Sequence, residues 1–281
     1  MPDLVSSGGA RRFGDGQCAV KMGWGIPESV YLRDSSPVAV NLNGYEKRTA
    51  DAVAHYWHTL QQQSKKQSTG DTDRERRTAV TGGKQMDGFC ELLEWFLIQN
   101  GLSDASIYAR SNLEIPGYFR PTKSWDLLVV HDGHLVAGCE FKSQRGPSFG
   151  NNFNNRTEEA LGNAVDVWTA YREGAFGVSR PAPWLGWLML LEDCERSASP
   201  VRVAEPHFMV SENFRDTSYA DRYGILLQRL VLEKQYNAAA YLLATEEGGA
   251  SGKYSEPVEG LGMKPFLASL GGHVAAYLAS I

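Results

Sequence analysis

Residues 125–142, which read WDLLVVHDGHLVAGCEFK, decide the fold of this 281-residue chain. Two apolar runs, Trp125–His131 and Leu135–Lys142, are joined by Asp132-Gly133, a dipeptide typical of tight hairpin turns. The sequence therefore predicts two antiparallel strands near the middle of the chain.

The loop between these strands decides which side chains face each other. Side chains alternate along a strand, so Glu140 and Lys142 share one face and Cys139 lies on the other. A two-residue turn would set Asp126 opposite Cys139, whereas a three-residue loop, Asp132–His134, or a bulge would set it opposite Glu140. We expect the odd-length loop or a bulge, because only that register pairs the two carboxylates.

In that register Asp126 and Glu140 would have Cβ atoms roughly 4.5–5.5 Å apart and could share one hard cation such as Mg²⁺. Lys142 would lie beside them and could hold a water molecule or offset charge on a phosphate. The pattern D-x13-E-x-K is weak by itself, because a solvent-facing strand with a salt bridge would read the same way.

The rest of the chain predicts an α/β or α+β domain with a small central sheet. Residues 1–43 are expected to be a disordered N-terminal extension and residues 44–281 a single domain. Polar connectors are predicted at 61–77 and 245–257, and a buried strand at 184–191. Helices are predicted at 45–60, 86–99, 157–173, 221–244 and 263–279.

Composition limits the functions that the chain can have. The net charge of -5 weighs against sequence-blind nucleic-acid binding, although a local basic cleft remains open because lysines and arginines recur between residues 65 and 156. No apolar run approaches the ~20 residues of a membrane span, and the first 30 residues lack the apolar core of a signal peptide. Four scattered cysteines indicate reduced thiols of a cytoplasmic protein.

Several longer strings around the candidate centre point to one family. Ala52–Trp57 (AVAHYW), Thr78–Phe89 (TAVTGGKQMDGF), Ile115–Val130 (IPGYFRPTKSWDLLVV) and the segment from Glu140 to Gly174 are the segments concerned. In these strings the chain resembles the PD-(D/E)xK nuclease superfamily, and more closely the XhoI-like type II restriction endonucleases. Trp125 replaces the proline of the superfamily's PD pair.

The resemblance implies a PD-(D/E)xK restriction-endonuclease-like core, with a small mixed central sheet flanked by helices. It implies a homodimer that needs Mg²⁺, cuts both strands of a palindromic double-stranded DNA site such as CTCGAG, and leaves 5′-phosphates. Asp126 and Glu140 would be metal ligands and Lys142 the catalytic lysine. Glu94 and Glu91 are candidates for an additional acidic residue, although both point away from the apolar stripe of their helix. A partner methyltransferase is implied, without a direct complex.

DNA reading requires side chains that match base edges, and arginine and asparagine or glutamine pair well with guanine and adenine. The amide-rich loop predicted after Lys142 offers such groups, with Asn155 expected to cap the following helix. Lys84 could contact a DNA phosphate, although its TGGKQ surroundings lack the spacing of a nucleotide-binding loop. The predicted DNA-binding residues are Lys84, Gln144, Arg145, Asn151, Asn152, Asn154 and Arg156.

Two other functions stay open at this point. A structure-selective repair or junction nuclease could use the same Asp126, Glu140 and Lys142, and a DNA-binding protein could recognise a site without cutting it. His55 and His58 lack the glutamate of a zinc hydrolase motif, so zinc hydrolysis is not expected. The acidic net charge predicts weak non-specific DNA binding at physiological salt.

Overall fold

The computed structural model describes residues 39–68, 84–177 and 181–281. Of the predicted N-terminal extension, residues 1–38 therefore lie outside the described residues. Residues 39–43 lead into the first helix. In this segment the backbone N–H of Asn41 donates to Asn100 Oδ1 at 2.8 Å. The Asn100 amide in turn donates to the carbonyl oxygen of Asn41 at 3.1 Å. The described residues belong to one compact unit, Ala39–Ile281.

A five-stranded mixed sheet forms the centre of this unit, in the order β1-β4-β5-β6-β7. β1, β4 and β5 are antiparallel neighbours, whereas β5, β6 and β7 are parallel. The strands are β1 (Ile107–Tyr108), β4 (Leu127–His131), β5 (His134–Gln144), β6 (Trp184–Glu192) and β7 (Ala238–Ala244). A separate antiparallel pair consists of β2 (Glu114–Pro116) and β3 (Thr122–Ser124). The predicted mixed sheet is thus confirmed.

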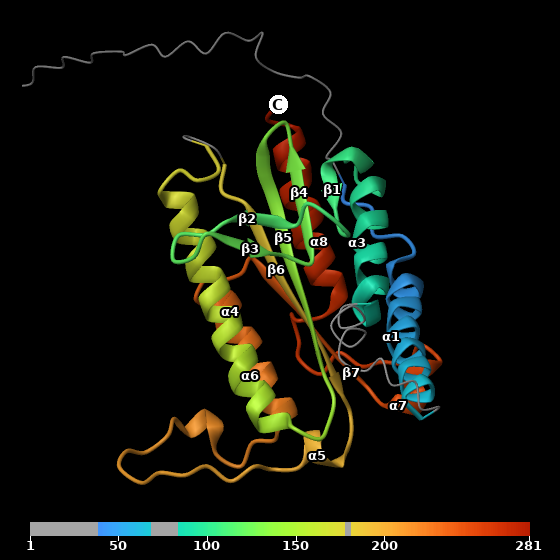
Figure 1. The fold of residues 1–281 in the computed structure, drawn as a ribbon, viewed down its shortest axis with the longest axis vertical. Helices are drawn as coiled ribbons and strands as arrows, with labels where there is room; N and C mark the ends of the chain where they lie inside the picture. Colours follow the sequence, from blue (N-terminus) through green and yellow to red (C-terminus); the bar gives the residue numbers. More distant parts are fainter. Residues whose placement is uncertain (1–38, 69–83, 178–180) are drawn as a thin grey trace, which may run out of the picture. The chain divides into compact units, whose positions relative to one another are not determined.

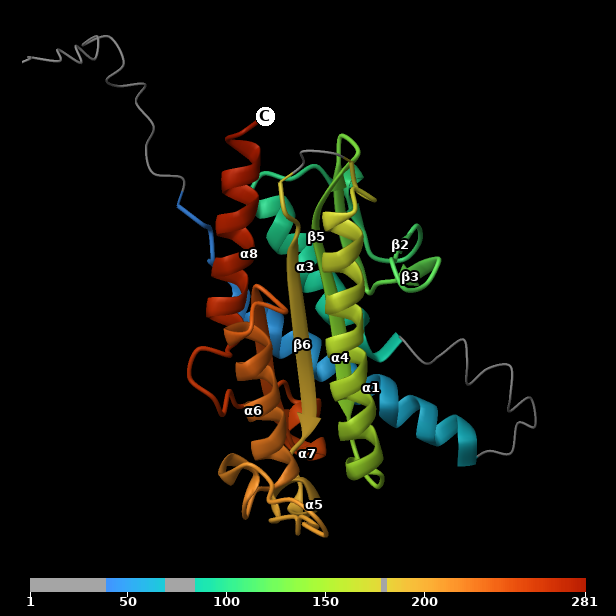
Figure 2. The same ribbon diagram turned by 90° about the vertical axis from the view of Figure 1, so that its left-hand side faces the viewer.

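Helices cover both faces of the sheet: α4 and α6 lie on one face, and α1, α3 and α8 on the other (Figures 1 and 2). The α-helices are α1 (Tyr45–Ser68), α3 (Asp87–Gln99), α4 (Phe149–Arg172), α5 (Glu195–Ala198), α6 (Tyr219–Leu232), α7 (Glu246–Ala250) and α8 (Met263–Leu278). Short 3-10 helices are η2 (Lys84–Met86), η3 (Asp104–Ser106) and η4 (Glu212–Phe214).

Each face of the sheet has its own apolar core. Trp57, Phe96 and Phe266 are buried in the core shared with α1, α3 and α8. Trp187 and Tyr223 are buried in the core shared with α4 and α6. Such aromatic side chains each bury ~150–250 Å² and dominate the packing energy of a domain. The sheet is therefore held rigidly between two helical layers, which fixes the side chains that its strands carry.

The hairpin between β4 and β5 differs from the expected loop. His131 pairs with His134, so the turn is a two-residue Asp132-Gly133 turn with positive φ at both positions, and the three-residue loop is wrong. The alternative, a bulge, is present: Val129 pairs with Ala137 and Val130 with Leu135, which leaves one extra residue on β5. Beyond the bulge Leu127 pairs with Cys139. Continued by one residue, this register sets Asp126 opposite Glu140, as the bulge was expected to do.

Three other boundaries differ from the sequence predictions. α1 continues to Ser68, so residues 61–68 of the predicted connector are helical, and residues 69–77 lie outside the described residues. α4 begins at Phe149 after the N-cap residue Ser148, so the predicted amide-rich loop is mostly helix and Asn155 is not its cap. Residues 238–244, predicted as helix, form β7, and the predicted connector at 245–257 contains α7.

No described helix is both long and apolar enough to cross a membrane. The three cysteines in the described ranges, Cys90, Cys139 and Cys194, are free thiols.

Candidate active site

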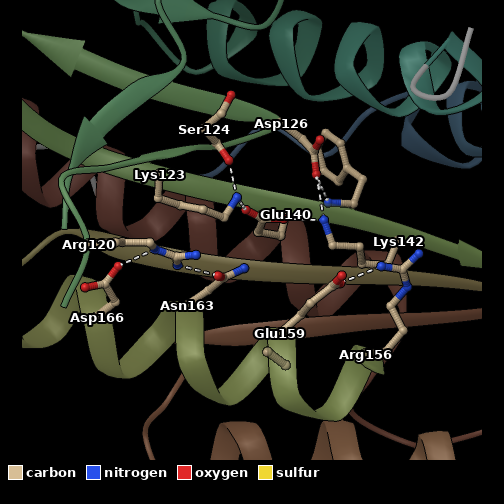
Figure 3. Close-up of polar contacts among 12 residues, drawn as sticks. Arg120, Lys123, Ser124, Asp126, Glu140, Lys142, Arg156, Glu159, Asn163 and Asp166 are labelled. Carbon is tan, nitrogen blue, oxygen red and sulfur yellow. Dashed lines mark hydrogen bonds and ion pairs between the residues drawn. The ribbon is translucent and has the colours of Figure 1, made fainter. Parts of the chain in front are cut away.

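The three residues predicted as catalytic come together where β4 and β5 meet (Figure 3). Asp126 lies one residue before β4, and its Oδ2 accepts a 2.7 Å hydrogen bond from the backbone N–H of Phe141. The Lys142 ammonium contacts Glu140 Oε2 and lies 3.6 Å from Asp126 Oδ2. Two carboxylates, one on β5 and one directly before β4, therefore face one ammonium group.

The two carboxylates differ in their access to solvent. Glu140 is only 1% exposed, whereas the side chain of Asp126 is 40% exposed. A buried carboxylate is costly unless it is paired, so Glu140 depends on the positive groups around it. The centre is therefore closed at Glu140 and open to solvent at Asp126.

Lys142 carries a proton in this arrangement. Burial alone would lower the pKa of its ammonium, but the carboxylates of Glu140 and Asp126 outweigh burial and raise the pKa above its ordinary value. The side chain is therefore a fixed positive charge at neutral pH. Such a group can stabilise negative charge that develops on a phosphate.

A second lysine, which sequence reasoning did not assign to the centre, completes the neutralisation. Lys123 lies on β3, and its Nζ is 2.5 Å from Glu140 Oε1 and also contacts the carbonyl oxygen of Ser124 (Figure 3). The sequence offered one weak signal, namely that Lys123 comes three residues before Asp126. Because β2 and β3 were not predicted, nothing placed Lys123 next to Glu140.

The oxygen atoms of the centre fit a hard divalent cation. Among the described residues no group of three or more His, Cys, Asp or Glu side chains could hold a metal ion. Mg²⁺ does not need one, since it commonly takes one or two carboxylates together with water and substrate phosphate. Glu140 Oε1 and the Ser124 carbonyl already surround one cation, the Lys123 ammonium. Asp126 and Glu140 are the residues that could hold the metal.

Helix α4 borders the centre with a further ion pair. The guanidinium of Arg156 lies 2.5 Å from Glu159 Oε2, and Glu159 contributes to the raised pKa of Lys142 after Glu140 and Asp126. Arg156, predicted to bind DNA, therefore lies on the same face as the catalytic candidates (Figure 3). In this structure its charge is offset by a carboxylate of its own helix.

A buried carboxylate on the same helix holds the turn between β2 and β3. Asp166 accepts hydrogen bonds from the backbone N–H groups of Tyr118 at 2.7 Å and Phe119 at 2.9 Å, and from Arg120 Nε at 2.7 Å. Arg120 also donates to Asn163 Oδ1 at 2.7 Å. Burial would raise the pKa of Asp166, but these hydrogen bonds and the guanidinium lower it below its ordinary value. The turn that carries β3 and Lys123 is thus fixed to α4.

The additional acidic candidates are paired elsewhere. Glu94 Oε1 accepts a 3.1 Å hydrogen bond from Arg110, and Glu91 Oε1 lies 3.8 Å from the same guanidinium. Glu91 is largely exposed, with 61% of its side-chain surface accessible. Both carboxylates therefore share Arg110 as their ion-pair partner, and a role for either at the centre stays a prediction.

The predicted DNA-binding residues fall into two groups. Gln144 is buried at the end of β5, where its Oε1 accepts a hydrogen bond from the hydroxyl of Tyr223. The oxygen of this amide therefore has a partner inside the fold, and the side chain does not reach the surface. Arg145 and Lys84 are exposed, and the carbonyl oxygen of Lys84 lies 3.0 Å from His55 Nε2.

The asparagines occupy the first turns of α4. Asn151 and Asn154 are exposed and line a groove of about 370 Å³, whereas Asn152 is half-buried. The opposite side of the groove is formed by the segment from Val201 to Phe214 and by Arg222 of α6. Sequence reasoning missed this opposite side, because its residues lie 47 or more positions away along the chain. The groove combines amides with the basic side chains of Arg202 and Arg222.

Comparison with known proteins gives consistent matches. Residues 65–256 match the family model described as "Restriction endonuclease XhoI". The chain is 50% identical to the type II restriction enzyme BstVI of Geobacillus stearothermophilus over 77% of this chain and 98% of that protein. It is 51% identical to the type II restriction enzyme AbrI of Azospirillum brasilense over 63% of this chain and 80% of that enzyme. It is 46% identical to the type II restriction enzyme XhoI of Xanthomonas vasicola over 70% of this chain and 79% of that enzyme. No solved structure matches the chain.

Proposed function

We propose a reaction for this chain from one premise: the chain belongs to the XhoI family of type II restriction endonucleases. Membership makes duplex DNA its substrate and hydrolysis its reaction. We infer that Asp126, Glu140 and Lys142 perform this hydrolysis, that Mg²⁺ assists it, and that a pair of identical chains cuts both strands. We further propose CTCGAG as the site, because the chain resembles enzymes that cut this sequence.

One observation carries the catalytic assignment. The Lys142 ammonium contacts the buried Glu140 carboxylate and lies 3.6 Å from the half-exposed Asp126 carboxylate. The order of these groups on an antiparallel pair, followed by α4 and the parallel strand β6, supports a PD-(D/E)xK core. A solvent-facing salt bridge is the weaker explanation, because Glu140 is 1% exposed.

Each residue has a defined task in this proposal. Asp126 and Glu140 would hold Mg²⁺, which when bound makes water more acidic and withdraws charge from a phosphate oxygen. Lys142 places its ammonium beside both carboxylates, where it can orient the attacking water and offset charge on the transition state. Water adds to phosphorus, the bond to the 3′-oxygen breaks, and the products carry a 5′-phosphate and a 3′-hydroxyl.

DNA recognition is proposed for the groove at the start of α4. Asn151 and Asn154 present amides that match adenine edges. Arg145 follows β5 directly, and Arg156 lies in the second turn of α4. Lys84 is proposed to contact a phosphate. Because the candidate reading residues follow Lys142 directly along the chain, correct docking would bring the scissile phosphate to the centre.

The test is digestion of a sequenced plasmid with Mg²⁺, followed by mapping of the ends. Discrete fragments ending within CTCGAG with 5′-phosphates are expected. Glu140→Gln should remove cleavage while specific binding persists, and the exposed Glu259→Gln should cut like the wild type. Cleavage confined to branched substrates would indicate a structure-selective nuclease. Specific binding without any cutting would indicate a non-cleaving DNA-binding protein, and full activity of Glu140→Gln would refute the assignment.

A further inference from the structure

The outer face of α4 carries apolar side chains that are partly exposed to solvent. α4 has 24 residues, and its inner face is buried through small and branched side chains such as Ala160, Ala164 and Val167. On the opposite side Leu161 is 43% exposed and Val165 is 44% exposed. Residues four apart lie on the same side of a helix, so these two side chains form an apolar stripe.

The turn between β2 and β3 adds two exposed aromatic side chains on the flank of α4 that carries Asp166. Tyr118 is 53% exposed and Phe119 is 70% exposed, and their rings contact each other edge to face at 5.1 Å. Asp166 of α4 fixes both backbone N–H groups, so the turn lies against the same helix. Gly117 permits this close approach, because a Cβ there would lie 2.6 Å from Asp166 Oδ2. The exposed rings are therefore held in a defined place.

Gly162 is the most informative residue of this face. It lies in the middle of α4, where glycine destabilises a helix by about 1 kcal/mol relative to alanine. A Cβ at this position would meet no atom within 4 Å, so packing against the described residues does not require glycine. Glycine on an outer helical face allows another backbone to approach closely.

We propose that the outer face of α4 (Leu161, Gly162 and Val165), together with Tyr118 and Phe119, is the surface through which two copies of this chain form a dimer. The inference rests on the proposed function, because cutting both strands of a palindromic duplex takes two identical centres. A twofold contact uses the same patch on both copies, so a self-complementary apolar strip is the expected chemistry.

The charge of the face favours a protein partner over DNA. Residues 158–171 of α4 contain no lysine or arginine but contain Glu158 and Glu159. DNA-binding surfaces depend on positive charge, whereas the centres of protein interfaces are poor in charge and rich in aromatic residues. Arg172 and Lys234 lie together at the far end of the helix, beside the half-buried Trp168, and would form part of a polar rim.

The size and orientation of α4 also suit a dimer contact. At ~1.5 Å per residue the helix is about 36 Å long, and a standard interface of ~800 Å² per partner is about 28 Å on a side. α4 therefore crosses such a patch completely. If the twofold axis runs along α4, the two N-terminal ends, which carry Asn151 and Asn154, point the same way. Both reading grooves and both centres would then face one duplex.

The experiment measures the mass of the full chain by light scattering and sedimentation over a range of concentrations. The wild type is expected to be a dimer. Gly162→Lys and Val165→Glu are each expected to raise the dimer dissociation constant at least a hundredfold and to give monomers. Lysine is a better helix former than glycine, so Gly162→Lys should leave the helical content unchanged. Gly272→Lys in α8 is the matched control, because Gly272 also has no atom within 4 Å of a built Cβ.

The outcomes separate this inference from the proposed function. A wild type that stays monomeric at every concentration, or variants that remain dimers, would overturn the proposal. Dimeric variants that lose affinity for a CTCGAG duplex would show that the face binds DNA instead. Cleavage of plasmid by the wild type is measured separately. If the wild type cuts and the variants stay dimeric, only the proposed interface is refuted. If the wild type does not cut, the proposed function is refuted.

Discussion

Removal of the Lys123 ammonium should strengthen the binding of a divalent cation. Four charged groups meet at the centre, namely the carboxylates of Asp126 and Glu140 and the ammonium groups of Lys123 and Lys142, so the formal charges sum to zero. Lys123 lies on Glu140 Oε1, one of the oxygens proposed for the metal, and its side chain is only 18% exposed. A cation that binds there must displace this ammonium. Lys123→Met would change the sum from zero to -1.

The size of the effect follows from the charges. Two unit charges 4 Å apart interact by about 4 kcal/mol at the effective dielectric constant of a protein surface. A divalent ion doubles this interaction, while solvent at the exposed side of Asp126 and relaxation of the lysine reduce it. We expect a net gain of about 3 kcal/mol, which corresponds to roughly a hundredfold lower dissociation constant.

Isothermal titration of the DNA-free protein with Mg²⁺ or Ca²⁺ measures this constant directly. Lys123→Arg keeps the positive charge and should bind the ion as weakly as the wild type. The exposed Lys234→Met removes a charge outside the centre and should change nothing. The Mg²⁺ concentration that gives half-maximal cleavage should fall in parallel for Lys123→Met. Unchanged or weaker ion binding by a folded Lys123→Met protein would refute this account of the centre.

Two further predictions concern α4. Asp166→Asn should lower the free energy of unfolding, measured by urea denaturation, by about 2–4 kcal/mol, because the buried carboxylate accepts three hydrogen bonds. The matched control Asp51→Asn, at an exposed site, should lower it by less than about 0.5 kcal/mol. Since the pKa of Asp166 is lowered in the folded state, its stabilisation is present above the ordinary value of 3.8 and is lost as the pH falls below it. The difference between wild type and variant should therefore shrink under acid; a constant difference would contradict this. Glu159→Gln should free Arg156, so the slope of log affinity against log salt for non-specific duplex should steepen by about 0.9, while Glu173→Gln should leave it unchanged.

That the Asp126 and Glu140 carboxylates face each other was predictable, because side chains alternate between the two faces of a strand. Glu140 and Lys142 share a face in any strand, and the pairing of Asp126 with Glu140 required a shift of one residue. The cause of the shift was not predictable. Leu135 packs toward α4 and α6, while Val136 and Ala137 both pack toward α1, α3 and α8. This break in alternation is the bulge, and it depends on two cores that the local sequence does not contain.

The two misassigned segments fail for related reasons. Ala238–Ala244 consists mostly of alanine and leucine, which have high helix propensity. It is nevertheless buried beside β6 in a parallel pair, where context overrides propensity. Its length of seven residues was a signal for a buried strand. The start of α4 contains four asparagines, which favour turns over helices, yet they are helical in the first turns after Phe149. There the tertiary contacts of Phe149 and Phe153 with Tyr219 outweigh local preference.

The neutrality of the centre explains how an acidic chain can be a selective nuclease. Four basic side chains around the centre each contact a carboxylate of the same domain: Lys123, Lys142, Arg156 and Arg120 (Figure 3). These internal ion pairs therefore weaken the attraction of the basic side chains to DNA phosphates, which agrees with a net charge of -5. A matched site can supply base contacts that outweigh the loss of these pairs, whereas an unmatched duplex offers phosphates alone. Discrimination at such a centre thus depends on exchanging internal ion pairs for external ones, and weakening an internal pair should increase binding to the wrong DNA first.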